Sequence, residues 1–274
     1  MTLRTALAQG TELLEREGIS EPRLTAEVLL AHAVHCDRTY FYAHPEQELR
    51  EVEWIHYGRY LDERLKGKPT QYITKRQEFY GREFKVSRDV LIPRPETELL
   101  VEAVLKLKPG PGAIIDVGTG SGAIAITLAL ELKHRVIATD LSPEACRVAR
   151  ENAQVLGADV QFIEADLLRP FTDGAADLVV SNPPYVPLND HAALQREVRD
   201  WEPSLALYGG PTGTAIYERL IPEAKRVLKP GGTLAMEIGF GQDEAVSAML
   251  KGWRNLQLLP DLAGIPRIVV CERP

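Results

Sequence analysis

The stretch AIIDVGTGSGAIAI, residues 113–126, decides the fold of this chain. It opens with an apolar run typical of a buried strand and closes with a run typical of a helix. Between the two runs, Gly118, Gly120 and Gly122 carry no side chain, so a ligand can approach the backbone closely. A strand, a glycine loop and a helix in this order predict an α/β sheet with a ligand site at the carboxyl end of the strand.

Apolar strand candidates alternate with helical segments from this stretch onward. Such alternation predicts a doubly wound, mostly parallel sheet with helices on both faces. The last two strand candidates have no helix between them, so we expect a terminal antiparallel hairpin at the edge of the sheet. The predicted strands are AIIDVG (113–118), RVIATD (135–140), VQFIEA (160–165), DLVVSN (177–182), TLAMEIG (233–239), LQLLPDL (256–262) and RIVVCER (267–273).

The chain before the glycine loop follows other patterns. Residues 1–75 show only helical periodicity, which predicts a small N-terminal helical bundle. Over residues 76–91 the pattern changes to short β-rich runs, so we expect a β-hairpin linker. A new helix is expected from Pro95, because proline suits the first turn of a helix, and the sheet domain is predicted over residues 92–274.

Composition and charge limit the possible functions. The formal net charge of −7 argues against a mainly electrostatic grip on nucleic acid, which needs clustered Lys and Arg. Cys36, Cys146 and Cys271 lie far apart without metal-ligand spacing, so we expect buried thiols in a reducing compartment and no metal site. The chain opens without a signal-peptide pattern, and no window approaches about 18 uncharged apolar residues. We therefore expect a cytoplasmic protein that does not span a membrane.

The glycine loop fits two kinds of cofactor. Gly118, Gly120 and Ala123 satisfy the dinucleotide pattern G-x-G-x-x-G/A, and Asp140 ends the next predicted strand, as in nicotinamide-dependent dehydrogenases. Asp116, however, places a carboxylate where a dinucleotide would bring its charged pyrophosphate, and like charges repel. S-adenosylmethionine carries a sulfonium and an ammonium group, and its ribose hydroxyls suit Asp140. The loop therefore favours S-adenosylmethionine, with a dehydrogenase as the alternative.

Two residues after the third predicted strand are further candidates for the cofactor site. The carboxyl ends of neighbouring strands line one crevice of a doubly wound sheet. Asp166 is therefore placed to reach the adenine amino group, and Leu167 to pack on the ring. A simple helix cap at Asp166 is an equal alternative.

The run DLVVSNPPYVPL, residues 177–188, ends its strand with an unusual tetrapeptide, Asn182-Pro183-Pro184-Tyr185. A carboxamide nitrogen is a poor nucleophile because its lone pair is delocalised into the carbonyl. Two fixed oxygens that accept its N–H groups turn the lone pair toward a methyl donor and stabilise the charge that develops. Asn182 offers a side-chain carbonyl, and Pro183 a backbone carbonyl whose direction is restricted by Pro184. Tyr185 adds an aromatic face for stacking on a planar amide or base.

These motifs together make the sequence similar to a known family. It resembles the class I S-adenosylmethionine-dependent methyltransferases and, within them, the release factor glutamine methyltransferases of the PrmC/HemK family. NPPY alone is shared with enzymes that methylate adenine, but its combination with LIPRPETE and the N-terminal helices is specific. The matching landmarks are GKPTQYIT, LIPRPETE, IIDVGTGSGAIAI, SNPPYVP, WEPSLALYGG, LKPGGTLAMEIGFGQ and DLAGIPRIVV, which span nearly the whole chain.

The resemblance implies a seven-stranded methyltransferase sheet and a defined reaction. The reaction is methylation of the side-chain amide N5 of the glutamine in the Gly-Gly-Gln motif of class 1 peptide chain release factors, with S-adenosylhomocysteine as the second product. The N-terminal helices would dock the release factor. Asn182, Pro183 and Tyr185 are the expected catalytic residues and, with Pro184, clamp the glutamine. The expected cofactor-binding residues are Asp116, Gly118, Thr119, Gly120, Ser121, Gly122, Asp140, Asp166, Leu167 and Asn182.

Some expectations remain open at this point. A sister activity on the glutamine of a large-subunit ribosomal protein would use the same clamp, and an adenine-N6 nucleic-acid methyltransferase is a more distant alternative. We expect a monomer that contacts neither nucleic acid nor a membrane. The sequence departs from the family at Pro211-Thr212-Gly213-Thr214, where an Asp-Gly-Leu run is common, so no role is carried onto these residues or onto Arg94 and Glu202.

Overall fold

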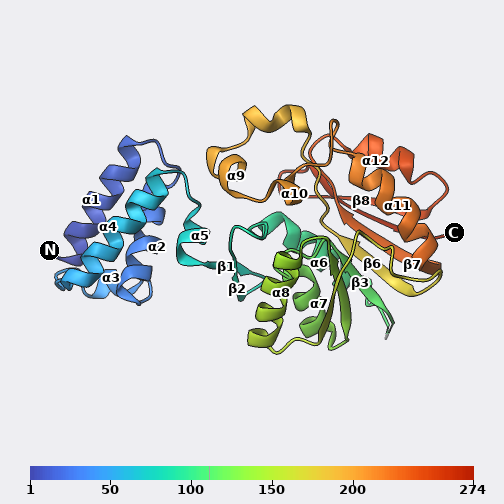
Figure 1. Cartoon of the computed structure of the whole chain (residues 1–274), viewed down its shortest axis with the longest axis horizontal. Helices are drawn as coiled ribbons and strands as arrows, with labels where there is room; N and C mark the ends of the chain where they lie inside the picture. Colours follow the sequence, from blue (N-terminus) through green and yellow to red (C-terminus); the bar gives the residue numbers. More distant parts are fainter. Residues whose placement is uncertain (111) are drawn as a thin grey trace. The chain divides into compact units, whose positions relative to one another are not determined.

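The computed structural model describes residues 1–110 and 112–274 (Figure 1). The described chain forms two compact units. The helical unit contains residues 1–76 and 195–201. The sheet unit contains residues 77–194 and 202–274.

The helical unit is built from amphipathic helices around one apolar core. Thr2 caps the first helix, its hydroxyl accepting the N–H of Thr5, and Pro22 starts the second. Leucines from both helices and the ring of Tyr57 fill the core. The helices of this unit are α1 (Leu3–Arg16), α2 (Pro22–Val34), α3 (Tyr40–Ala43), α4 (Glu51–Leu65), α5 (Thr70–Thr74) and α9 (Arg196–Trp201).

The elements of the sheet unit confirm the predicted alternation of strands and helices. Its strands are β1 (Arg76–Phe79), β2 (Arg82–Lys85), β3 (Ile114–Val117), β4 (Val136–Asp140), β5 (Val160–Glu164), β6 (Ala176–Ser181), β7 (Leu228–Glu237), β8 (Arg254–Pro260) and β9 (Pro266–Glu272). Its helices are α6 (Pro95–Lys106), α7 (Ala123–Leu132), α8 (Pro143–Leu156), the 3₁₀ helix η1 (Leu188–Ala193), α10 (Ser204–Leu207), α11 (Ala215–Val227) and α12 (Asp243–Met249).

Seven strands form the main sheet in the order β5-β4-β3-β6-β7-β9-β8, and β1 pairs with β2 in a separate ribbon. The pairs from β5 to β7 are parallel, whereas β9 runs antiparallel to both β7 and β8. The predicted doubly wound sheet with a terminal antiparallel hairpin is therefore confirmed.

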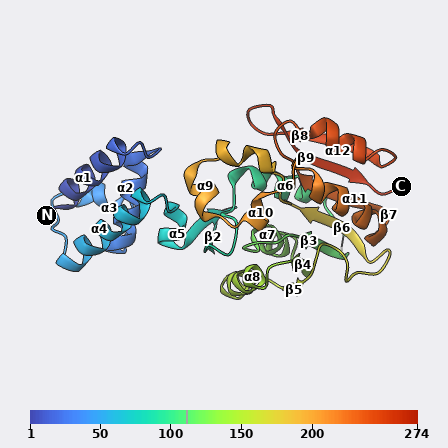
Figure 2. The same ribbon diagram turned by 45° about the horizontal axis from the view of Figure 1, so that its top comes forward.

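Alternating residues of the strands bury two apolar layers, one on each face of the sheet. Ile114 packs with the layer that α6 and α7 cover, whereas Ile115 packs with the layer that α11 and α12 cover. Figures 1 and 2 show these two pairs of helices on opposite faces. Because both faces are covered, the central strands read as continuous apolar runs.

The strand order reverses between β3 and β6, which are paired side by side. Their register joins Val117 to Ser181, so the next residues, Gly118 and Asn182, leave the sheet together at its carboxyl edge. In open α/β sheets ligands bind at such a switch point. The topology therefore brings the glycine loop and the Asn-Pro-Pro-Tyr turn to one place.

Candidate active site

The glycine loop leaves space above its backbone. Gly118 and Gly120 adopt left-handed conformations, with φ of 74° and 56°, and a Cβ added at either would meet nothing within 4 Å. The N–H groups of Gly118 and Thr119 both donate to the carbonyl of Thr139, at 2.8 and 2.9 Å. These two hydrogen bonds to β4 hold the loop in an open conformation. The backbone of the loop therefore stays accessible to a ligand.

The first carboxylate of the site, Asp116, is fully buried at the end of β3. The Thr119 hydroxyl donates to its Oδ2 at 2.6 Å, while Oδ1 has no partner among the described residues. Burial raises the pKa of Asp116 to about 7, against the hydrogen bond from Thr119 and the nearby backbone N–H of Ala125. A buried oxygen without a donor is costly, so this carboxylate suits a cationic ligand such as the ammonium end of S-adenosylmethionine.

The second carboxylate, Asp140, ends β4 and is tied to two loops. Its Oδ2 accepts the N–H of Gly120 at 2.8 Å, and its Oδ1 accepts the N–H of Ser142 at 2.9 Å. Burial raises its pKa, and these N–H groups oppose the rise. Each oxygen keeps a second lone pair, so the half-buried carboxylate can still accept ribose hydroxyls.

Ser121 and Gly122 anchor the loop to the helices behind it. The carbonyl of Ser121 accepts the side-chain N–H of Asn152, from α8, at 2.8 Å. A Cβ at Gly122 would lie 2.7 Å from Cδ1 of Ile126, so this glycine permits close packing of α7. These two residues are therefore held by α8 and α7.

Asp166 and Leu167 follow β5 in an arrangement that the sequence did not indicate. Both carboxylate oxygens of Asp166 accept Nη2 of Arg219, at 2.7 Å each, and Arg169 lies at 3.2 Å. Leu167 adopts a left-handed conformation with φ of 54°, which is unusual for a residue with a branched side chain. An adenine amino group would have to share Asp166 with Arg219.

The Asn-Pro-Pro-Tyr turn presents two oxygens that no protein donor occupies. Nδ2 of Asn182 donates to the Thr97 hydroxyl at 3.0 Å. Among the described residues, neither Oδ1 of Asn182 nor the carbonyl of Pro183 accepts a hydrogen bond. Neither proline of the turn has an N–H to compete for them. The turn therefore offers two free acceptors beside the glycine loop.

The rear of this turn is packed against a glycine-rich wall. Nε2 of Gln242 donates to the carbonyl of Tyr185 at 2.9 Å, while its Oε1 accepts the N–H of Gly239. A Cβ at Gly213 would lie 2.3 Å from the Tyr185 carbonyl, and one at Gly209 would lie 2.6 Å from that of Pro184. The segment 211–214, to which the sequence assigned no role, thus supports the turn from behind.

A buried carboxylate, Glu237, lies at the end of β7 behind the turn. It is 1% exposed, and it accepts the Thr97 hydroxyl at 2.7 Å and the Tyr185 hydroxyl at 3.0 Å. Burial raises the pKa of Tyr185, and the neighbouring Glu237 raises it further. Sequence reasoning missed Thr97, Glu237 and Gln242. The one available signal was a glutamate inside the apolar run TLAMEIG.

Arg94 and Glu202 form an ion pair in which the glutamate side chain is 1% exposed. Glu202 also accepts the N–H of Ile92 at 3.2 Å. This carboxylate therefore joins the LIPRPETE segment to the WEPSLAL segment. Its position favours a structural role for Arg94.

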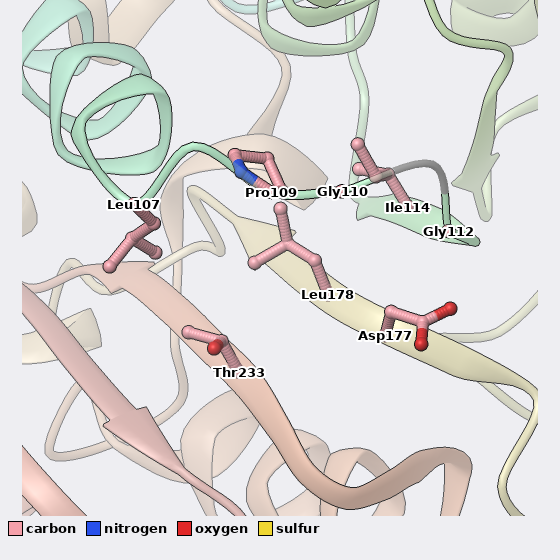
Figure 3. Close-up of a pocket in the computed structure, with 8 residues that line it drawn as sticks. All are labelled: Leu107, Pro109, Gly110, Gly112, Ile114, Asp177, Leu178 and Thr233. Atoms are coloured by element: carbon pink, nitrogen blue, oxygen red, sulfur yellow. The ribbon is translucent and has the colours of Figure 1, made fainter.

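A cavity of about 250 Å³ lies at the other edge of the sheet, around the starts of β3 and β6 (Figure 3). Its Asp177 carboxylate already accepts the N–H of Ala113 and the Lys229 ammonium, each at 2.8 Å. Because it lies at the starts of these strands, the cavity is separate from the carboxyl edge. It is lined by Leu107, Pro109, Gly110, Gly112, Ile114, Asp177, Leu178 and Thr233.

Residues 1–110 and 112–274 contain neither a metal-binding cluster nor a membrane-spanning helix. No group of three or more His, Cys, Asp and Glu side chains is arranged to hold a metal ion. No helix there is both long and apolar enough to cross a membrane.

The sheet and the glycine-loop site together define a class I S-adenosylmethionine-dependent methyltransferase. The fold is shared with a methyltransferase from Pyrococcus furiosus, at a TM-score of 0.55 and 18% identity over 74% of this chain and 93% of that one. It is also shared with the Mtq2–Trm112 complex of E. cuniculi, which methylates the termination factor eRF1, at a TM-score of 0.51 and 24% identity over 68% of this chain and 99% of that one.

The family is shown by comparison of sequences. The family models for the PrmC N-terminal domain and the methyltransferase small domain match residues 5–74 and 95–199. Release factor glutamine methyltransferases from Koribacter versatilis and Moorella thermoacetica are 47% and 45% identical, each over 100% of this chain and 99% of the relative. The chain belongs to the family of release factor glutamine methyltransferases.

Proposed function

We propose that the chain transfers the methyl group of S-adenosylmethionine to the side-chain amide N5 of the glutamine in the Gly-Gly-Gln motif of class 1 peptide chain release factors. The observation that carries this proposal is the pair of free acceptors, Oδ1 of Asn182 and the carbonyl of Pro183, at the edge where the glycine loop ends. Full-length similarity to enzymes with this name supports the choice of substrate.

The cofactor would be held by the residues around the glycine loop. Asp116 suits its positive charge, Asp140 its ribose hydroxyls, and the backbone of Gly118 and Gly120 admits it closely. When bound, it supplies a methyl group on a cationic sulfur. The proposed set is completed by Thr119, Ser121, Gly122, Asp166, Leu167 and Asn182.

The chain's own residues prepare the amide nitrogen. Asn182 and Pro183 each accept one of the two N–H groups. These two hydrogen bonds fix the plane of the glutamine amide, so that the lone pair of its nitrogen, which is perpendicular to this plane, points toward the methyl donor. Positive charge that develops on nitrogen is stabilised because both acceptors carry partial negative charge. Tyr185 provides a flat surface for the amide, and Pro184 restricts the backbone so that the Pro183 carbonyl keeps its direction.

Several wider assignments are part of this proposal. The helical unit, which matches the PrmC N-terminal domain model, docks the release factor. The enzyme works in the cytoplasm, because its substrate is a translation factor, and it works as a monomer. It contacts no nucleic acid directly, in keeping with its net charge of −7. A methyl group that leaves a cationic sulfur needs no metal to activate it.

Mass spectrometry of a release factor after incubation with enzyme and cofactor tests the proposal. We expect one added methyl group, located on the glutamine of the Gly-Gly-Gln motif. A release factor with alanine in place of that glutamine should gain none. Transfer that survives this replacement, or that goes instead to a large-subunit ribosomal protein offered in parallel, would refute the assigned substrate.

A further inference from the structure

The buried carboxylate of Glu237 joins the two ends of the Asn-Pro-Pro-Tyr turn. One oxygen, Oε2, accepts the Thr97 hydroxyl at 2.7 Å, and the other, Oε1, accepts the Tyr185 hydroxyl at 3.0 Å. Thr97 in turn accepts Nδ2 of Asn182 at 3.0 Å. A continuous chain of hydrogen bonds therefore runs from Asn182 to Tyr185 through helix α6 and strand β7.

The direction of this chain follows from the number of available protons. An ionised carboxylate only accepts hydrogen bonds, so both hydroxyls must donate to Glu237. A threonine hydroxyl has a single proton, and once that proton is given to Glu237, its oxygen can only accept from Asn182. The only donor on the Asn182 side chain is its NH₂ group. Its carbonyl oxygen is therefore turned to the opposite side, where no protein donor meets it.

We propose that Glu237 and Thr97 are positioning residues, which hold the Asn182 amide in the one orientation that presents its carbonyl oxygen to the substrate. Without this constraint, the two orientations of an asparagine amide differ little in shape, and one of them would present NH₂ to the NH₂ group of the glutamine. The inference rests on the proposed function of Asn182 as an acceptor.

The arrangement also predicts a dependence on pH. Burial raises the pKa of Glu237, and Glu96 of α6 raises it further. The hydroxyls of Thr97 and Tyr185, and Arg267 of β9, lower it, while Tyr217 of α11 bonds to the Glu237 carbonyl. A protonated Glu237 can donate to Thr97, which frees the threonine proton to bond Oδ1 of Asn182. Turnover should therefore fall as the pH decreases through the pKa of Glu237, which lies above the ordinary 4.5.

Three threonine variants test the proposal. Thr97→Val removes the hydroxyl with little change of shape, Thr97→Ser keeps it, and Thr127→Val makes the same exchange at a buried threonine whose hydroxyl has no partner among the described residues. Turnover on a release factor, its KM, the cofactor Kd by calorimetry and the melting temperature are measured for each. We expect kcat to fall about tenfold in Thr97→Val, with cofactor Kd unchanged. Thr97→Ser should restore it to within about threefold, and Thr127→Val should match the wild type.

The pH profile separates positioning from a general loss of structure. The acidic fall in kcat should persist in wild type and Thr97→Ser and flatten in Thr97→Val, because Asn182 is then no longer coupled to Glu237. Equal activity of Thr97→Val and Thr97→Ser would overturn the proposal. So would a loss in Thr97→Val that only follows its melting temperature.

A measurement without catalysis keeps this inference distinct from the proposed function. In ¹⁵N-labelled protein, the side-chain NH₂ signals of Asn182, assigned by their absence in Asn182→Ala, should shift with the ionisation of Glu237 in wild type and not in Thr97→Val. Failure of the wild type to methylate a release factor refutes the proposed function alone. If the Asn182 NH₂ signals do not change with pH in any of the proteins, the positioning role of Glu237 and Thr97 is refuted, while the proposed function is not.

Discussion

In the proposed reaction, the side-chain carboxamide of Asn182 activates the carboxamide of the substrate glutamine. Its oxygen and the Pro183 carbonyl have no protein partner in the described chain, whereas its nitrogen is bonded to Thr97. An amide that is held on one side and free on the other is preorganised, so little reorganisation is needed when the substrate arrives.

Asn182→Ala should separate catalysis from cofactor binding. We expect turnover to fall at least about a hundredfold, since one of two oriented acceptors is lost. The Kd for S-adenosylmethionine should stay within about threefold, because the glycine loop and Asp140 remain. Radiolabelled methyl transfer and calorimetry check the two parts. A near-normal rate would show that this side chain is not an acceptor for the substrate.

Asp116 should make both stability and cofactor affinity depend on pH. Burial raises its pKa from 3.8 to about 7, so the folded state holds the proton more tightly than the unfolded chain. Its contribution to the free energy of unfolding is therefore full below pH 4 and is lost as the pH rises to about 7, by up to about 4 kcal/mol. Asp116→Asn should remove this slope in denaturant titrations.

The same carboxylate should bind the cationic cofactor better once it is ionised. Affinity for S-adenosylmethionine is expected to rise between pH 6 and pH 7.5 in the wild type, because Asp116 loses its proton over about this range. In Asp116→Asn the affinity should be lower and nearly flat. Isothermal calorimetry at several pH values measures both, and parallel curves for the two proteins would contradict the assignment.

The positions of some site residues could be predicted from the sequence, whereas those of others could not. Asn182 and Asp116 lie inside recognisable motifs next to strand ends, so spacing alone predicts where they lie. Thr97 and Glu237 are brought to the turn from opposite directions along the chain, and only the fold joins them. Asp166 and Arg219 are also far apart in the sequence, so their ion pair could not be predicted from it. For this reason the sequence indicated a contact of Asp166 with adenine but not the competing contact with Arg219.

At the scale of elements, glycines determine how closely segments pack behind the Asn-Pro-Pro-Tyr turn. Gly213 and Gly231 have nearly equal left-handed conformations, with φ of 80° and 77°. A Cβ at Gly213 would meet the Tyr185 carbonyl at 2.3 Å, whereas one at Gly231 would meet nothing within 4 Å. The pair therefore allows backbone strain and steric displacement to be told apart.

Gly213→Ala should impair turnover, whereas Gly231→Ala should not. Both variants lose about 1 kcal/mol of stability because alanine disfavours a left-handed conformation, and Gly213→Ala loses more because its Cβ must also displace the Tyr185 carbonyl. Only Gly213→Ala displaces a backbone atom of the turn, and we expect its kcat to fall about tenfold or more. Chemical denaturation and methyl transfer measure the two effects. An equal loss of activity in both variants would contradict the supporting role of segment 211–214.

The seven strands of the main sheet were predictable because each is an apolar run bounded by polar or glycine residues. The β-rich pattern predicted over residues 76–91 includes the start of the run DVLI (89–92), but Val90 and Ile92 are buried without forming a strand. The N–H of Ile92 bonds to Glu202 instead of to a neighbouring strand. A side chain that satisfies a distant backbone group leaves no local pattern in the sequence.

At the scale of the whole molecule, the cofactor should stabilise the fold. S-adenosylmethionine or S-adenosylhomocysteine at about 100 times its Kd should add roughly 2.7 kcal/mol to the free energy of unfolding. NAD should add nothing, since Asp116 is buried where its pyrophosphate would lie. Thermal melts with each compound check this expectation. Stabilisation by NAD alone would instead indicate a dehydrogenase.

The helical unit is not one uninterrupted piece of the chain. Residues 195–201 belong to it, and Glu197 of α9 pairs with Arg64, whose side chain is only 7% exposed. On the ribosome, Arg64 is made long before its partner. An unpaired charge would be costly to bury, so we expect Arg64 to reach its buried, paired state only after residues 195–201 have left the ribosome. This member of the release factor methyltransferase family would then complete its folding late in its own synthesis.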